Sequence, residues 1–322
     1  MEETKPLVSF IVPVYNVPVE MLRECIGSIL SLTLRPFERE IIIVDDGSDV
    51  CPIIEMPDLA EDIIYIRQSN AGVSVARNRG LKMASGRFIQ FIDADDMLHR
   101  APYEHVLDIL RYQECDMVMF DFTKKRECSL LYEDSGPVSG AELMRRENVH
   151  GSVCCYAFCR SMLGSLRFTP GVDYGEDEEF TPQLLLRAEY AYRTTAQAYY
   201  YRERHSSAIC STDLKSRLHR LDDTKDVIVR LRKIADRMPA ADRLAMQRRI
   251  AQLTMDYIYN VIVLTRDRHF LNHKIEELSK LGLFPLPDRD YTAKYKWFRR
   301  MTNSAVGRAI LLITLPMLNR ER

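Results

Sequence analysis

Residues 8–120 alternate between strand patterns and helix patterns. Five short apolar runs have the β-rich composition of strands covered on both faces, and they span residues 8–14, 40–44, 62–66, 87–92 and 116–120. Between these runs, apolar residues recur at helical spacing over residues 20–32, 71–84 and 102–114. This alternation predicts an α/β fold with a mostly parallel, doubly wound sheet that is flanked by helices.

The pattern changes in the later part of the chain. Beyond residue 128 the segments become irregular, and a pair of short strands is expected near Ala191 and Tyr199. Residues 214–238 and 240–266 then have the periodicity of two long helices. We therefore expect a sheet domain over residues 1–210 and a helical region over residues 211–322, which a chain of this length can hold.

The composition is that of an ordinary globular protein. Charged residues make up 28% of the chain and the formal net charge is −1, which gives no reason to expect nucleic acid as a partner. Residues 1–6 lack the basic start and the apolar stretch of a secretory signal. The eight cysteines lack the spacing of a zinc site, so we expect reduced thiols in a cytoplasmic protein.

Four polar segments follow strands, at the edge where a parallel sheet binds its ligands. The first segment, Pro13-Val-Tyr-Asn16, comes directly after the first predicted strand. Pro13 is expected to end the strand ladder, and the ring of Tyr15 could stack against a nucleobase. A plain strand terminus explains the same residues equally well.

The second segment, Asp45-Asp-Gly-Ser48, follows the second strand. Two adjacent carboxylates before Gly-Ser make a turn that exposes hydrogen-bond acceptors at its rim. A carboxylate of Asp45 or Asp46 can accept the imide N–H of uracil, which neither cytosine nor adenine presents in the same way. The structural alternative is an Asx-turn or a helix cap.

The third segment covers residues 68–80 and leads into the second predicted helix. Gly72 allows close approach of the backbone, and the N-terminus of a helix that begins near Ser74 attracts anions. Arg77 and Arg79 could add positive charge near a diphosphate. The alternative is a capped surface helix, which explains Arg79 better than Arg77.

The fourth segment, Asp93-Ala-Asp-Asp96, follows a buried strand and gathers three carboxylates. Such a cluster raises the pKa values of its own members unless a cation or hydrogen bonds relieve the repulsion. Mg²⁺ or Mn²⁺ takes oxygen ligands and accepts phosphate oxygens to complete its shell. Asp93 could therefore reach a ribose while Asp95 bridges a metal ion to a diphosphate, unless the segment is only a solvated turn.

The ordered segments resemble the motifs of the family 2 glycosyltransferases, which have the GT-A fold. The matching motifs are V-S-F-I-V-P-V-Y-N, I-V-D-D-G-S, N-x-G-x-S-x-A-R-N-x-G and F-I-D-A-D-D. The resemblance is close over residues 7–122 and looser over residues 168–180 and 199–207. It implies an inverting transfer from a UDP-sugar to a saccharide or lipid-linked saccharide acceptor, with Mg²⁺ or Mn²⁺ as cofactor.

The resemblance also implies roles for individual residues. Asp46 would face the nucleobase, Arg77 would lie near the base and the phosphates, and Asp93 would contact the ribose. Asp95 would bind the metal ion that holds the diphosphate. The full nucleotide-sugar site would comprise Pro13, Tyr15, Asp45, Asp46, Asn70, Gly72, Arg77, Asp93 and Ala94.

An inverting transfer needs a carboxylate opposite the leaving diphosphate, to take the proton of the acceptor hydroxyl. The Gly-Glu-Asp part of residues 168–180 resembles the segment that supplies this base in the family. Glu176, Asp177, Glu178 and Glu179 are all candidates, although acidic residues are also favoured at the start of a helix. We expect Asp177 to be the base, with Glu176 in a supporting or acceptor-binding role.

Two further features leave alternatives open. His205 could bind the metal ion or the diphosphate, but a lone histidine is more often a hydrogen-bonded structural residue. The basic and aromatic segment 294–300 and the apolar run 309–315 could lie on an anionic membrane surface, at its inner face. Alternatively, they pack back on the domain with Trp297 in the core.

Two other functions fit part of the pattern. A nucleotidyltransferase has a similar sheet and similar metal chemistry, but it would carry a Gly-rich, Lys- or Arg-bearing loop where this chain has Pro13-Val-Tyr-Asn16. A non-catalytic nucleotide-binding assembly partner would not need both Asp93 with Asp95 and Glu176 with Asp177. These rivals are less consistent with the sequence than a sugar transferase.

Overall fold

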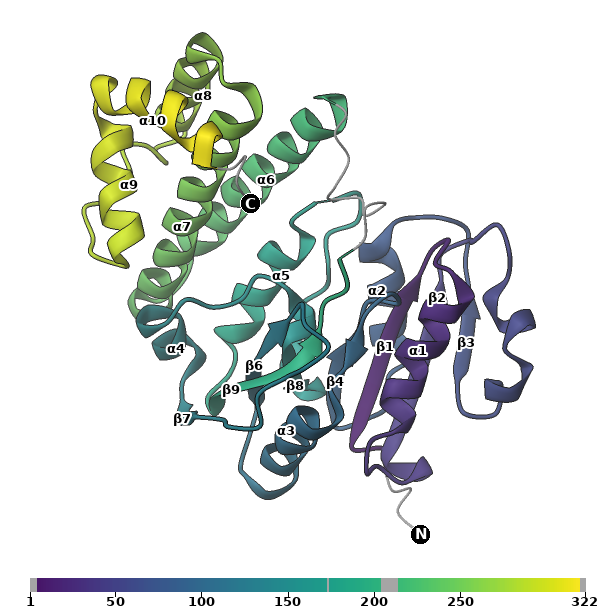
Figure 1. Cartoon of the computed structure of the whole chain (residues 1–322). Coiled ribbons are helices and arrows are strands. Elements are labelled where there is room, and N and C mark those ends of the chain that lie inside the picture. Colours follow the sequence, from purple (N-terminus) through teal and green to yellow (C-terminus); the bar gives the residue numbers. More distant parts are fainter. Residues whose placement is uncertain (1–4, 173, 204–213, 319–322) are drawn as a thin grey trace. The chain divides into compact units, whose positions relative to one another are not determined.

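The computed structural model describes residues 5–172, 174–203 and 214–318 (Figure 1). The chain divides into two compact units, Met1–Cys210 and Ser211–Arg322. The described part of the first unit is a β-sheet with helices, and that of the second unit is helical. The division follows from the sequence, because strand patterns end near residue 200 and long helical periodicity begins near residue 214.

A mixed sheet of nine strands forms the first unit within the described residues, in the order β3-β2-β1-β4-β8-β6-β9-β5 with β7 beside β9. Pairing is parallel from β3 through β2 and β1 to β4, and again between β6 and β9. The other four pairings are antiparallel. The strands are β1 Val8–Val14, β2 Arg39–Asp45, β3 Ile64–Arg67, β4 Phe88–Phe91, β5 Met97–Leu98, β6 Met117–Thr123, β7 Asp134–Val138, β8 Tyr156–Cys159 and β9 Ala191–Tyr200.

Helices connect and cover the strands of this sheet. They are α1 Val19–Leu30, α2 Val73–Met83, α3 Arg100–Tyr112, α4 Gly140–Arg146 and α5 Glu176–Leu185. Strands β2 and β3 follow one another on one side of β1. Helix α2 then leads to β4, which pairs with β1 on its other side. Gly80 lets α2 lie close to β1, because a Cβ there would be 2.3 Å from Cγ2 of Ile11.

The eight elements predicted between residues 8 and 120 are all present, with ends that differ by at most three residues. The α/β class with flanking helices is confirmed, although the sheet is more mixed than its first half suggests. The short pair of strands expected near Ala191 and Tyr199 is wrong, since β9 is one strand of ten residues. Pro13 does not end the ladder either, because β1 continues to Val14 and Pro13 lies opposite Val44 of β2.

The second unit is built from helices in its described part. They are α6 Leu214–Ala235, α7 Ala240–Thr265, α8 Arg268–Lys280, α9 Ala293–Asn303 and α10 Ala305–Leu318. The predicted apolar stripe of α7 is buried at Ile250, Leu253, Tyr257 and Val261. No helix within residues 5–172, 174–203 and 214–318 is long and apolar enough to cross a membrane.

The exposure of Trp297 in α9 contradicts the alternative in which this residue enters the core. Tyr295 and Phe298 are 1% and 2% exposed and form the buried side of α9, whereas Trp297 is 50% exposed. Residues three positions apart lie on the same side of a helix, so Trp297 shares its exposed side with Lys294 and Arg300. The indole therefore faces outward among basic side chains.

Candidate active site

Polar side chains gather beyond the carboxyl ends of β1, β2 and β4, where the order of the strands reverses. The reversal occurs at β1, which has β2 on one side and β4 on the other. Loops that leave neighbouring strands in opposite directions open a crevice at such a point. A cavity of about 470 Å³ lies next to it, with Arg77, Asp93, Glu176 and Asp177 in its wall.

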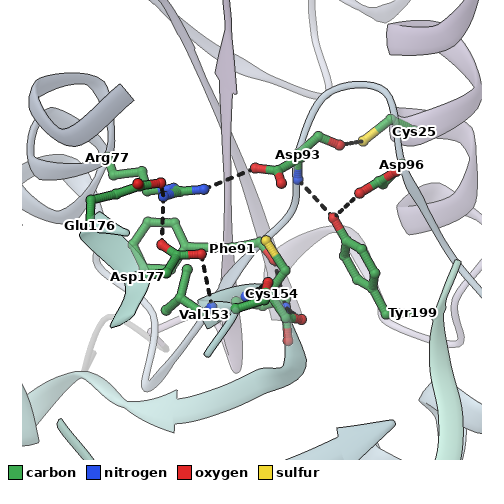
Figure 2. Close-up of polar contacts among 12 residues, drawn as sticks. Cys25, Arg77, Phe91, Asp93, Asp96, Val153, Cys154, Glu176, Asp177 and Tyr199 are labelled. Atoms are coloured by element: carbon green, nitrogen blue, oxygen red, sulfur yellow. Dashed lines mark hydrogen bonds and ion pairs between the residues drawn. The ribbon is translucent and has the colours of Figure 1, made fainter. Parts of the chain in front are cut away.

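The guanidinium of Arg77 joins three carboxylates in this cavity (Figure 2). Its Nη1 lies 2.8 Å from Oε1 of Glu176 and 2.6 Å from Oδ1 of Asp177. Its Nη2 lies 3.0 Å from Oδ1 of Asp93. One positive charge thus faces three carboxylates, and the cluster keeps a surplus of negative charge when all three are ionised.

The guanidinium of Arg77 lies over two aromatic rings. Only 3% of its side chain is exposed, and its Cζ lies 5.9 Å from the ring centre of Phe91 and 5.4 Å from that of Phe168. The apolar surroundings strengthen its ion pairs. The resemblance implies that Arg77 lies near the base and the phosphates, but in the structure its terminal nitrogens contact the carboxylates of Asp93, Glu176 and Asp177.

Glu176 and Asp177 begin α5, directly after Gly175 in a left-handed conformation with φ of 84°. Oδ2 of Asp177 accepts a hydrogen bond of 3.1 Å from the backbone N–H of Val153, which fixes the second carboxylate oxygen. Burial raises the pKa of Asp177 to about 8; the Arg77 charge opposes this shift, and the charges of Glu176 and Asp93 add to it. Burial likewise raises the pKa of Glu176, against the lowering effect of Arg77.

The turn after β4 is anchored by Asp96 and Tyr199. The Tyr199 hydroxyl donates to Oδ2 of Asp96 at 2.7 Å and accepts from the backbone N–H of Asp93 at 3.1 Å (Figure 2). The backbone N–H of Arg202 donates to Oδ1 of Asp96 at 2.8 Å. Asp96 is 1% exposed, and burial together with the charge of Asp93 raises its pKa to about 8.

These contacts give Asp96 a positioning role that the sequence analysis did not assign. The sequence signal for this role was only that Asp96 directly follows Asp95 as a third carboxylate. Its partners Tyr199 and Arg202 lie 103 and 106 residues away along the chain. Ala94 is 2% exposed and fills the inside of the turn. Asp93 and Asp95 are partly exposed, so their carboxylates can reach a ligand.

Few of the described residues are placed to bind a divalent cation. No group of three or more His, Cys, Asp or Glu side chains that could hold a metal ion occurs in the described residues. Mg²⁺ and Mn²⁺ need only one or two protein carboxylates when substrate phosphates complete the shell, and the oxygen donors of Asp93 and Asp95 suit these ions. The residues therefore fit a cation shared with a diphosphate. His205 lies outside the described residues.

Asp45 and Asp46 have different surroundings. Asp45 is fully buried and accepts hydrogen bonds from the N–H of Ser48 at 2.8 Å and from the hydroxyl of Tyr65 at 2.6 Å. Burial alone would raise the pKa of Asp45, but these hydrogen bonds outweigh it and lower the pKa below its usual value. Asp45 thus holds the turn after β2. This role is the structural alternative that the sequence left open for Asp45 and Asp46.

Asp46 connects the end of β2 to the start of α2. Its Oδ1 accepts hydrogen bonds from the side chain of Gln68 at 2.7 Å and from the N–H of Ala71 at 2.9 Å. Its Oδ2 accepts from the N–H of Gly72 at 2.8 Å, at a φ of 89° that favours glycine. Asp46 is only 4% exposed, and it orders the loop in which a nucleotide would bind.

Two further predicted residues lie exposed in loops at the carboxyl ends of β1 and β3. Tyr15 is 52% exposed after β1, and Asn70 is exposed in the loop before α2. The loop after β2 touches the loop before α2, because a Cβ on Gly47 would lie 2.8 Å from the backbone N of Asn70. It also touches the loop after β1, because the backbone N–H of Asp49 donates to Oδ1 of Asn16 at 2.9 Å. The structure therefore brings the segments after β1, β2 and β3 together on one side, and joins Asp93 to the acidic pair on the other.

Known proteins are similar in sequence to part of this chain. It is 30% identical over 211 residues to the minor teichoic acid biosynthesis protein GgaB of Bacillus subtilis (strain 168), covering 62% of this chain and 23% of that protein. It is 31% identical over 222 residues to the uncharacterized glycosyltransferase EpsJ of the same strain, covering 63% and 62% of the two chains. The chain thus spans about a quarter of GgaB and three fifths of EpsJ.

Solved structures share this fold, and a family profile matches part of the sequence. The structure matches that of S. aureus TarS residues 1–349 with a TM-score of 0.64 and 17% identity, over 98% of this chain and 91% of the other. At this identity the match shows the fold, which is the GT-A type. The sequence profile of glycosyl transferase family 2 matches residues 9–164, which contain Asp46, Arg77, Asp93 and Asp95. The chain thus matches glycosyl transferase family 2 over just under half of its length.

Proposed function

We propose that this chain transfers a sugar from a UDP-sugar to a hydroxyl group of a saccharide or lipid-linked saccharide, with inversion at the anomeric carbon. The observation that carries the proposal is the link, through Arg77, between Asp93 at the end of β4 and the acidic pair at the start of α5. This link holds a donor-side carboxylate and two candidate bases within one cavity. An inverting transfer needs these two components at facing positions.

The donor would bind in the crevice beside β1, with Asp46 and the loop before α2 around the nucleoside. The half-exposed ring of Tyr15 offers a stacking surface, and the N-terminus of α2 offers its positive dipole end to phosphates. A solved structure of S. aureus TarS residues 1–349 is a complex with UDP-GlcNAc. The shared fold and family support a UDP-sugar as the donor of this chain.

The reaction would use one base and no separate acid. Asp177 would take the proton of the acceptor hydroxyl as that oxygen attacks the anomeric carbon, and Glu176 would help to orient the acceptor. Arg77 would keep both carboxylates in position. A divalent cation at Asp93 and Asp95 would stabilise the charge that grows on the departing diphosphate.

The acceptor would bind in the same cavity. Its lining includes the aromatic side chains of Phe122, Tyr174 and Tyr201 together with the acidic pair of α5. Flat aromatic faces with a few polar groups are the usual lining of a site for a small organic ligand. These rings are suited to hold a sugar ring while Asp177 faces its hydroxyl.

Replacing Asp95 with asparagine is expected to remove the metal dependence of UDP binding. Loss of an outer-shell partner costs about 10–100-fold in metal affinity, so loss of a direct carboxylate should cost at least as much. Calorimetric titration of UDP with and without Mn²⁺ measures this effect. A Mn²⁺-bound mannosyltransferase of the same fold, PcManGT from Pyrobaculum calidifontis, supports the choice of ion, at 15% identity and a TM-score of 0.59.

The matched control for this variant is Asp108→Asn, an exposed carboxylate on α3 that is outside the cavity. It should bind UDP with the Mn²⁺ dependence of the unmodified protein. If Asp95→Asn kept that dependence as well, the metal ion would be held by other residues.

The pH profile is expected to show the raised pKa of Asp177. A base must be ionised to accept a proton, so kcat/KM should rise with pH and level off above the pKa of about 8. At about pH 7 roughly a tenth of the free enzyme would carry the ionised carboxylate. Rates measured between about pH 6 and 9 test this, and a profile that is flat over this range would contradict it.

A direct transfer assay tests the proposed function. Purified protein is incubated with UDP-, GDP- and dTDP-sugars and Mn²⁺, with saccharide acceptors, and released nucleoside diphosphate and glycosylated product are measured. We expect UDP release that depends on acceptor, and a product whose anomeric configuration by NMR is opposite to that of the donor. Retention of configuration would overturn the mechanism, and UDP binding without turnover across the panel would favour the non-catalytic nucleotide-binding alternative.

A further inference from the structure

Helix α10 has apolar side chains on two opposite sides. Its inner side is formed by Gly307, Leu311 and Leu315, which follow one another at helical spacing and are buried. The other side carries four exposed apolar residues at spacings of four, three and four, which we call the α10 stripe. Val306, Ile310, Ile313 and Met317 of this stripe are 70%, 45%, 65% and 66% exposed.

This arrangement is unusual for a helix on the surface of a water-soluble unit, whose outer side is normally polar. The buried side of α10 packs against α7 and α9, so the core of the unit is already closed beneath it. Within the described part of the helix, residues 305–317, the single charged residue is Arg308, whose Nη1 donates to the carbonyl oxygen of Thr302 at 2.7 Å. The α10 stripe therefore presents a continuous apolar surface.

Helix α9 precedes α10 with only Ser304 between them (Figure 1). Its exposed side is basic. Lys294, Trp297 and Arg300 are exposed and follow at three-residue spacing, so they share one side of the helix. Residues 293–318 contain five Lys and Arg residues and no Asp or Glu, whereas the whole chain has a net charge of −1. Positive charge is thus concentrated in the same helical pair as the exposed apolar residues.

We propose that α9 and α10 dock on an anionic lipid surface, with the α10 stripe among the acyl chains and the basic side of α9 at the headgroups. Exposed apolar residues combined with Trp and several Lys or Arg residues are the composition of interfacial helices. Each basic side chain is attracted by anionic headgroups, and Trp prefers the interface. A helix of 14 residues is about 21 Å long, which is too short to span the bilayer.

A second protein molecule could also cover an apolar stripe, but the charge favours lipid. A protein interface is depleted in Lys at its centre, whereas Lys294 and Arg300 are exposed on α9, the helix that precedes this stripe. The proposal goes beyond sugar transfer, because transfer to a soluble acceptor needs no membrane. Docking would bring the catalytic unit to acceptors that are attached to lipids.

Vesicle co-sedimentation of the full chain tests the proposal. The protein is mixed with vesicles of phosphatidylcholine alone or with phosphatidylglycerol added, at low and high salt. We expect binding to the anionic vesicles that weakens with salt. The variant Ile313→Asp should bind at least about tenfold more weakly, because a charge replaces an apolar side chain that docking would place among the acyl chains. Lys294→Gln and Arg300→Gln should each weaken binding on the order of fivefold.

The matched control is Ile54→Asp, in the 3₁₀ turn Pro52–Glu55 of the first unit, where the isoleucine is 75% exposed. It should bind vesicles as the unmodified chain does. Ile313→Asp should keep its circular dichroism spectrum and its transfer rate on a soluble acceptor, which separates lost docking from lost folding or lost catalysis. Vesicle binding that is absent, or that is unchanged in Ile313→Asp, would overturn the proposal. A concentration-dependent dimer by light scattering that Ile313→Asp abolishes, without vesicle binding, would assign the stripe to a second copy of the chain.

Discussion

Replacing Arg77 with methionine is expected to destabilise the first unit and to abolish sugar transfer. Methionine keeps an unbranched side chain against Phe91 and Phe168 but removes the charge that Asp93, Glu176 and Asp177 share. Breaking a buried ion pair from one side costs about 3–5 kcal/mol because the partner's charge is left buried without a counterion. The three carboxylates are 38%, 14% and 17% exposed, so solvent screening reduces this cost.

We therefore expect the free energy of unfolding to fall by roughly 2–3 kcal/mol in Arg77→Met. The loss should depend on pH with a definite sign. Without Arg77 the carboxylates repel one another and their pKa values rise, so the folded state binds more protons than the unfolded state. Stability of the variant should then increase as pH falls from about 8 to 5, and the difference from the unmodified protein should shrink.

Denaturant unfolding at both pH values measures the effect, and Arg79→Met is the control. Arg79 is exposed on the same helix, and no ion pair of its side chain is seen among the described residues. Its replacement should change stability by less than about 0.5 kcal/mol, as is usual for surface positions. An Arg77→Met protein with unchanged stability at pH 8 would mean that the three carboxylates do not need this counterion.

The first half of the fold could be predicted because its information is local. Strands such as β1 and β2 are covered on both faces, and so their sequences are continuous apolar runs that periodicity reveals. The second half depends on partners far along the chain. The first half of β9 contains Arg193 and Thr194, and Arg193 is accommodated by an ion pair of 2.7 Å with Asp121 of β6. A single strand with such polar residues looks like two short strands when its partner is unknown.

The candidate site shows the same division. Asp93 and Asp177 stand out in the sequence because each lies in an acidic motif at the end of a strand or the start of a helix. Their connection could not be predicted, because Arg77 is 16 residues from Asp93 and 100 residues from Asp177. The sequence also could not tell a carboxylate that meets a ligand from one that anchors a loop. Asp45 and Asp96 anchor turns through Tyr65 and Tyr199, which only the folded chain brings within reach.

Replacing Asp177 with asparagine is expected to stop transfer while leaving donor binding and folding intact. Asparagine has the same shape, and its single acceptor oxygen can keep one of the two contacts of the carboxylate, with the N–H of Val153 or with Nη1 of Arg77. It cannot accept the proton of the acceptor hydroxyl, and general base catalysis contributes about 10²–10⁴-fold to a rate. We expect kcat to fall by about this factor, measured as acceptor-dependent UDP release, with the affinity for UDP unchanged.

Stability gives this prediction a second, independent readout. The raised pKa of Asp177 means that its ionised form is less favourable in the folded state than in the unfolded state. A neutral side chain removes that cost, so Asp177→Asn should be at least as stable as the unmodified protein at pH 8, with the difference vanishing towards pH 4. Asp108→Asn, on the exposed side of α3, should change neither rate nor stability. Turnover of Asp177→Asn at the unmodified rate would transfer the role of base to Glu176, and Glu176→Gln would then show the loss in kcat instead.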